Sequence, residues 1–131
     1  MGSRTELTLP ARPESVAIAR RAVAELGRKS AFDERRVGDL RTVVSEACMN
    51  AVVHAYDRPG GEFEISAESC EGGILVTVCD RGSGIKPRPA IGSPAPSARL
   101  GLLLIAALSQ SVEISSRPGG GTRMRMNVSA N

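Results

Sequence analysis

Residues 45–56 of this chain read SEACMNAVVHAY. Most of these residues are small and apolar, which is typical of a helix face that packs into a protein core. Glu46, Asn50 and His54 nevertheless recur at a spacing of four residues, and residues four apart on a helix are neighbours. Taken alone, the triplet favours a solvated polar border on a buried helix, with His54 as a structural hydrogen-bonding residue.

The composition around this stretch is that of one globular domain. The chain has 131 residues, of which 41% are hydrophobic and only 2% aromatic, so its core must be aliphatic. The net charge of +3 comes without a dense basic patch or stacking aromatic residues, so we expect no direct binding to nucleic acid.

The cysteines and the N-terminus bear on location. The three cysteines are odd in number and lack metal-type CxxC spacing, which indicates free thiols in a reducing cytoplasm. The N-terminus has no signal-peptide pattern, and the longest apolar run, at 100–108, is too short to cross a bilayer. We therefore expect a cytoplasmic protein that does not enter a membrane.

Hydrophobic periodicity predicts an α+β fold. Apolar residues at helical spacing and alternating residues in strands predict three helices, at 13–27, 34–56 and 100–109, and five strands, at 4–9, 62–68, 74–79, 112–115 and 122–128. Because short turns join most strands, the sheet should be mixed but mostly antiparallel, with helices on one face of a two-layer sandwich. Four prolines between 86 and 97 predict a loop there. No linker divides residues 1–131, so we expect a single domain.

Two groups of residues have side chains suited to binding a nucleotide. The oxygens of Glu46 and Asn50 suit Mg²⁺, which prefers oxygen ligands, and the carboxylate of Glu46 could also orient or deprotonate a hydroxyl group. DRGSGI at 80–85 places Asp80 at a strand end, where a carboxylate could accept a hydrogen bond from an exocyclic amine such as that of adenine. An ordinary turn after the strand is the alternative interpretation of this second group.

Two glycine-containing segments follow. In LGLLLI at 100–105, Gly101 at a helix start would leave backbone N–H groups exposed to an anion, although a small residue in a buried helix is equally ordinary. GGGT at 119–122 precedes the last strand and is explained equally well by a hairpin turn.

The order of these four motifs resembles that of the GHKL ATPases, and most closely that of the small anti-sigma-factor serine/threonine kinases. EACMNAVVHAY resembles the N box of the family, DRGSGI its first glycine box, LGLLLI its second and PGGGT its last. The resemblance covers about residues 4–128. It implies the Bergerat-type ATP-binding fold, with ATP and Mg²⁺ as ligands and a lid over about 86–99.

The resemblance also implies roles for individual residues. Glu46 would act as the general base or orienting group, Asn50 would bind Mg²⁺, and Asp80 would accept the adenine amine with Thr122 in support. Arg99 stands where the family usually has the first glycine of Gly-x-Gly-Leu, and it would add a cation near the phosphates. The complete nucleotide-binding set is Asn50, Asp80, Gly82, Gly84, Ile85, Arg99, Gly101, Leu102 and Thr122.

Relatives of this kind phosphorylate a serine on a small anti-anti-sigma antagonist and sequester a sigma factor, commonly as homodimers. The resemblance therefore implies an anti-sigma factor with serine kinase activity that regulates transcription. The alternative is a nucleotide-binding interaction module that transfers no phosphate. A self-phosphorylating histidine kinase is not expected, because His54 is the only histidine and belongs to the predicted Mg²⁺ helix.

Overall fold

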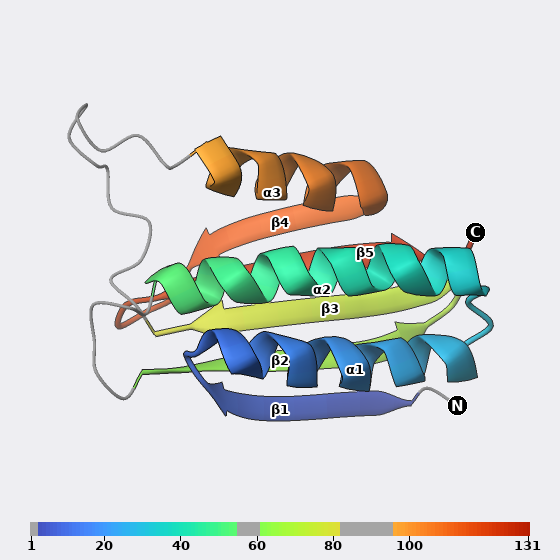
Figure 1. Cartoon of the computed structure of the whole chain (residues 1–131), viewed down its shortest axis with the longest axis horizontal. Coiled ribbons are helices and arrows are strands. Elements are labelled where there is room, and N and C mark those ends of the chain that lie inside the picture. Colours follow the sequence, from blue (N-terminus) through green and yellow to red (C-terminus); the bar gives the residue numbers. More distant parts are fainter. Residues whose placement is uncertain (1–2, 55–60, 82–95) are drawn as a thin grey trace.

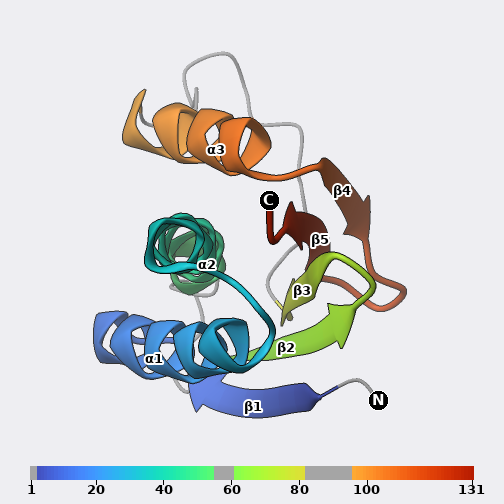
Figure 2. The same ribbon diagram turned by 90° about the vertical axis from the view of Figure 1, so that its right-hand side faces the viewer.

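Three helices lie side by side on one face of a five-stranded sheet in the computed structural model, which describes residues 3–54, 61–81 and 96–131 (Figures 1 and 2). The side chains of His54 and of residues 96–99 are not among those described. In chain order, the elements are β1 (Arg4–Pro10), α1 (Pro13–Lys29), α2 (Glu34–His54), β2 (Glu62–Cys70), β3 (Gly73–Asp80), α3 (Pro96–Leu108), β4 (Ser111–Ser116) and β5 (Thr122–Ser129).

The sheet has the strand order β1-β2-β3-β5-β4, and all four pairings are antiparallel. The predicted α+β sandwich with helices on one face is therefore confirmed, whereas the expectation of a mixed sheet is wrong, because every pairing among the described strands is antiparallel. Val76 of β3 lies between Ala67 of β2 and Met126 of β5, and all three side chains are buried. This register aligns the apolar residues of neighbouring strands beneath the helices, as the two-residue period of a strand requires.

Helix α2 is the centre of the helical layer, between α1 and α3 (Figure 2). The predicted apolar stripe of α2 is confirmed, because its members are buried: Leu40, Val43, Val44, Ala47, Cys48, Ala51 and Val52. The predicted free thiols are also confirmed. Burial raises the pKa of Cys48 to about 12, so this thiol packs in the core in its neutral form.

The start of α2 and the end of α1 follow from local chemistry. Asp33 caps α2, because its Oδ1 accepts a hydrogen bond from the backbone N–H of Arg36 at 2.8 Å. Helix α1 continues to Lys29, past its predicted end at Gly27. Gly27 is buried against Leu40 of α2, where a Cβ would lie 2.9 Å from Leu40 Cδ2, so this glycine serves helix packing.

Helix α3 begins at Pro96, so the predicted start at residue 100 is wrong. Proline is tolerated in the first turn of a helix, because the N–H that it lacks has no partner within the helix there. The last residues of the predicted loop and lid, 96–99, are therefore helical, and residues 86–95 lie outside the described residues. No helix in the described ranges is long and apolar enough to cross a membrane.

Candidate active site

Four of the predicted motifs meet at one end of the molecule, on the left in Figure 1. The second half of α2, the end of β3, the start of α3 and the turn between β4 and β5 all lie there. These elements contribute Glu46 and Asn50, Asp80, Gly101, and Thr122, respectively. The fold thus gathers residues that are up to 76 positions apart, from 46 to 122, in the sequence.

Asp80 is a buried carboxylate that is held in place by the start of β5. Asp80 is only 4% exposed, and its Oδ1 accepts a hydrogen bond from the backbone N–H of Thr122 at 3.2 Å. The carbonyl oxygen of Asp80 accepts a further bond from Arg117 Nη1 at 3.2 Å. A buried charge is costly unless hydrogen bonds satisfy it, and the bond from the Thr122 N–H orients the carboxylate at the strand end.

Thr122 supplies a polar atom that is suited to a ligand. Its Oγ1 is buried, and among the described residues it has no hydrogen-bond partner. Leaving a buried hydroxyl unpaired costs about 1–3 kcal/mol. A hydroxyl and a carboxylate side by side, both buried, fit the polar edge of an adenine ring, which offers both a donor amine and acceptor nitrogens. The residues present therefore fit ATP at this position.

Gly121 allows the β4–β5 turn to cross the end of β3. It has a φ of +105°, a region that favours glycine, and a Cβ built on it would overlap the carbonyl oxygen of Asp80. That Cβ would also lie 3.0 Å from Arg81 Cα. The sequence predicted only a turn here. The third consecutive glycine, directly before the strand, was the one available sign of this close approach.

Replacing Gly121 with alanine is expected to destabilise the fold by roughly 2 kcal/mol or more, because backbone strain and overlap with Asp80 add together. Gly119 provides the matched control, since its φ is +85° but a Cβ would meet nothing within 4 Å. Gly119→Ala should therefore cost only the strain, about 1 kcal/mol. Thermal unfolding measures both variants, and equal melting temperatures would contradict the proposed overlap.

Glu46 lies directly beneath α3. Gly101 of α3 is buried, and a Cβ at this position would lie 2.6 Å from Glu46 Oε2. Because α3 begins at Pro96, Gly101 is in the second turn of the helix. The expectation that Gly101 opens the helix and exposes its N–H to an anion is therefore wrong, since N–H groups beyond the first turn bond within the helix.

The remaining predicted residues are placed in part. Asn50 is half-buried and lies one turn beyond Glu46 on α2, whereas Leu102 is 38% exposed on α3. The side chain of Arg99 is not described, and the other predicted members of the first glycine box lie outside the described residues: Gly82, Gly84 and Ile85. The roles of all these residues stay predictions.

Binding of Mg²⁺ at this site would need few protein ligands. Among the described residues, no three His, Cys, Asp or Glu side chains cluster as a metal-binding set. Mg²⁺ usually keeps several waters, shares phosphate oxygens with a nucleotide and takes one or two protein ligands. One side-chain oxygen from Asn50 fits that requirement.

Comparison with known proteins places the chain in a family. The sequence model for the histidine kinase-like ATPase domain matches residues 9–128. The chain belongs to the histidine kinase-like ATPase domain family. Within this family, the chain is 33% identical over 126 residues to serine-protein kinase RsbW of Oceanobacillus iheyensis, covering 87% of this chain and 80% of the relative. It is 26% identical over 137 residues to anti-sigma F factor of Clostridium botulinum, covering 98% of this chain and 96% of the relative.

Solved structures in the family share the fold. The chain is similar to the crystal structure of the RsbU and RsbW domains of a Mycobacterium tuberculosis protein, with a TM-score of 0.72 and 23% identity. That likeness covers 97% of this chain and 32% of the solved chain, so this chain spans about a third of it. The GHKL-type fold expected from the motif order is therefore confirmed.

Proposed function

We propose that this chain is an ATP-dependent serine protein kinase that phosphorylates a small antagonist protein and sequesters a sigma factor, and so regulates transcription. The observation that carries the proposal is the buried pair of Asp80 and Thr122, which is suited to an adenine base at the end of the sheet. The names of the relatives, serine-protein kinase and anti-sigma factor, support the same activity. We propose that residues 1–131 form one cytoplasmic domain.

The proposed reaction needs positioning more than covalent chemistry. Asp80 would accept a hydrogen bond from the adenine amine, and Asn50 would hold Mg²⁺, whose charge offsets that of the phosphates. Glu46 would orient the substrate serine and take its proton as the serine oxygen bonds to the γ-phosphorus. The bond between the γ-phosphorus and the bridging oxygen breaks, and ADP leaves.

Two measurements test this function. Proteins captured from the source cell on the immobilised chain, with and without ATP, should include a small antagonist and a sigma factor. Incubating the chain and that antagonist with Mg²⁺ and ATP should then add one phosphate to a serine, seen by mass spectrometry. ATP binding without transfer to any captured protein would favour the alternative, an interaction module that binds nucleotide but has no kinase activity.

Asn50→Ala should reveal the proposed metal ligand. We expect the affinity for ATP in the presence of Mg²⁺ to fall about tenfold, since water can partly replace the lost amide oxygen. Affinity for ATP in EDTA should be unchanged, because no metal is then held. Calorimetry measures both affinities. Val53→Ala, which changes an exposed residue on the same helix, is the control. If Asn50→Ala bound ATP in Mg²⁺ as tightly as wild type does, Asn50 would not be a metal ligand.

We also propose that the chain forms a homodimer through the face of the sheet opposite the helices. No helix among the described residues covers this face (Figure 2), which holds a depression of about 530 Å³. Its charged lining includes three carboxylates on β1 and β2 and two guanidinium groups on β5: Glu6, Glu64, Glu68, Arg123 and Arg125. Arg4 pairs with Glu6 and Glu68, and Arg81 pairs with Glu64, so on the β1–β2 side three carboxylates share two guanidinium groups.

This charge pattern is self-complementary. Glu64 and Arg123 both pair with Cys79 of β3, one on each side, so they lie in one row across the face. A second copy related by a twofold axis parallel to β3 would place the arginines of each protomer over the carboxylates of the other. Opposite charges facing each other in this way favour association and fix its register.

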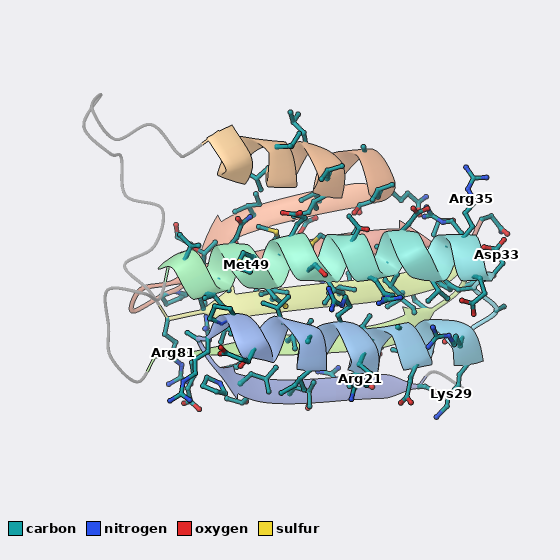
Figure 3. The ribbon with its side chains drawn as sticks, viewed as in Figure 1. Arg21, Lys29, Asp33, Arg35, Met49 and Arg81 are labelled. Atoms are coloured by element: carbon teal, nitrogen blue, oxygen red, sulfur yellow. The ribbon has the colours of Figure 1, made fainter. Side chains whose placement is uncertain are left out.

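Arg123→Glu is expected to weaken self-association about tenfold, because like charges would then face each other across the twofold axis. The double variant Glu64→Arg/Arg123→Glu should restore association by exchanging the two charges. Arg21→Glu, which changes an arginine on α1 in the helical layer (Figure 3), is the control. Analytical ultracentrifugation measures the monomer–dimer equilibrium. A wild-type protein that stays monomeric at about 100 μM contradicts the proposal.

A further inference from the structure

We infer that Gly101 is a positioning residue, because its lack of a side chain leaves beside α3 the space that the Glu46 carboxylate occupies. The inference rests on the proposed function for its meaning in catalysis. The contact itself is independent of nucleotide. It assigns Gly101 a steric role in place of the exposed anion site that its sequence context predicted.

The contact involves the whole Glu46 side chain. The three heavy atoms nearest to a Cβ built at Gly101 all belong to Glu46: Oε2 at 2.6 Å, Cδ at 3.4 Å and Cβ at 3.8 Å. Gly101 itself is buried, and Glu46 is half-buried. The acidic side chain therefore runs along the space that a side chain at position 101 would occupy.

Any side chain at position 101 must displace the acid. Real Cβ atoms essentially never approach within 3.0 Å of another heavy atom, and the 2.6 Å distance is to Oε2 at the flexible end of Glu46. The carboxylate would therefore move before the backbone of α2 or α3 does. A displacement of about 1 Å at a reacting group costs on the order of 100-fold in rate, so this space bears directly on a general base.

The other end of α3 is tied to α2 as well. Arg36 of α2 donates from Nη2 to the carbonyl oxygen of Leu108, the last residue of α3, at 3.4 Å. The same guanidinium group donates to Ser129 O at 2.8 Å and pairs with Asp39 at 2.7 Å. Helix α3 is thus fixed over α2 at its C-terminal end, which limits how far it can move away from Glu46.

A mutant cycle in urea tests the contact without nucleotide. Alanine ordinarily stabilises a helix relative to glycine, so Gly38→Ala on α2, where a Cβ would meet nothing within 4 Å, should raise the unfolding midpoint by roughly 0.3 M. Gly101→Ala should raise it by less than Gly38→Ala does, because displacing the Glu46 carboxylate offsets part of the gain. In the Glu46→Ala background, Gly101→Ala should raise the midpoint as Gly38→Ala does.

Kinetics then test the catalytic consequence. In wild type, Gly101→Ala should lower kcat for serine phosphorylation by about 100-fold, with less than about a threefold change in KM for ATP. In the Glu46→Asp background the shorter acid avoids the methyl group, so Gly101→Ala should change kcat by less than about threefold.

The outcomes separate this inference from the proposed function. A wild-type protein that transfers no phosphate ends the kinase proposal, while the urea cycle still decides whether Gly101 and Glu46 are in contact. Additive midpoints in that cycle overturn the inference. So does an equal rise in KM for ATP in both backgrounds, which would make Gly101 a nucleotide contact.

Discussion

Glu46→Ala is expected to slow phosphoryl transfer to the antagonist serine by about 10²- to 10⁴-fold, the usual contribution of a general base. Affinity for ATP should stay within about threefold of wild type, since Glu46 is proposed to act on the serine hydroxyl and not on the nucleotide. Single-turnover transfer measured at saturating ATP isolates the chemical step. Calorimetry on the same protein gives the affinity.

Two further variants define what Glu46 does. Glu46→Gln keeps the size of the side chain and its fit beneath Gly101 but removes the base, so its rate should resemble that of Glu46→Ala. Met49→Ala changes an exposed residue on the same helix (Figure 3) and should transfer phosphate at the wild-type rate. If Glu46→Gln transferred phosphate as fast as wild type, Glu46 could be only an orienting group.

Asp80→Asn is expected to weaken ATP binding about 10- to 100-fold. The variant keeps an oxygen that can accept the bond from the Thr122 N–H, but it turns the second oxygen into a donor. That donor would face the donor amine of adenine, and losing a hydrogen bond to a charged group costs about 1.5–3 kcal/mol. Because the hydrogen bond from the Thr122 N–H is kept, the melting temperature without nucleotide should change little.

Inosine triphosphate makes this prediction specific. It has a carbonyl oxygen in place of the adenine amine, so wild type should bind ATP more tightly than the inosine analogue, and Asp80→Asn should lose that preference. Glu34→Gln, which alters an exposed carboxylate at the start of α2 that pairs with Arg28, is the matched control. An unchanged preference in Asp80→Asn would show that Asp80 does not read the base.

Most of the fold could be predicted from local patterns. The stripe of α2 from Leu40 to Val52 and the alternation of β2 and β5 are recorded directly in residue spacing, because each periodicity reports which face of an element is buried. Where prediction was wrong, local chemistry was ambiguous. Pro96 reads as loop in a proline-rich segment, yet proline is also tolerated in the first turn of a helix.

The candidate site was predictable in its polar residues but not in its contacts. The resemblance in motif order pointed to Glu46, Asn50, Asp80 and Thr122, whose roles stay predictions. Spacing could not show that Glu46 occupies the space beside Gly101 or that Gly121 overlies Asp80, since each pair of residues is about 40 or more positions apart.

Local structure and long-range contacts have different physical origins. Residue pattern was sufficient for most helix and strand positions and for the core, because burial and turn chemistry act over a few neighbouring residues. The family was indicated by the resemblance in motif order. The positions of Gly101 and Gly121 depend on how α3 lies on α2 and on the register of β5 beside β3. Those relations are set by packing across the whole domain, and they turn two ordinary-looking glycines into the residues that hold Glu46 and Asp80 in place.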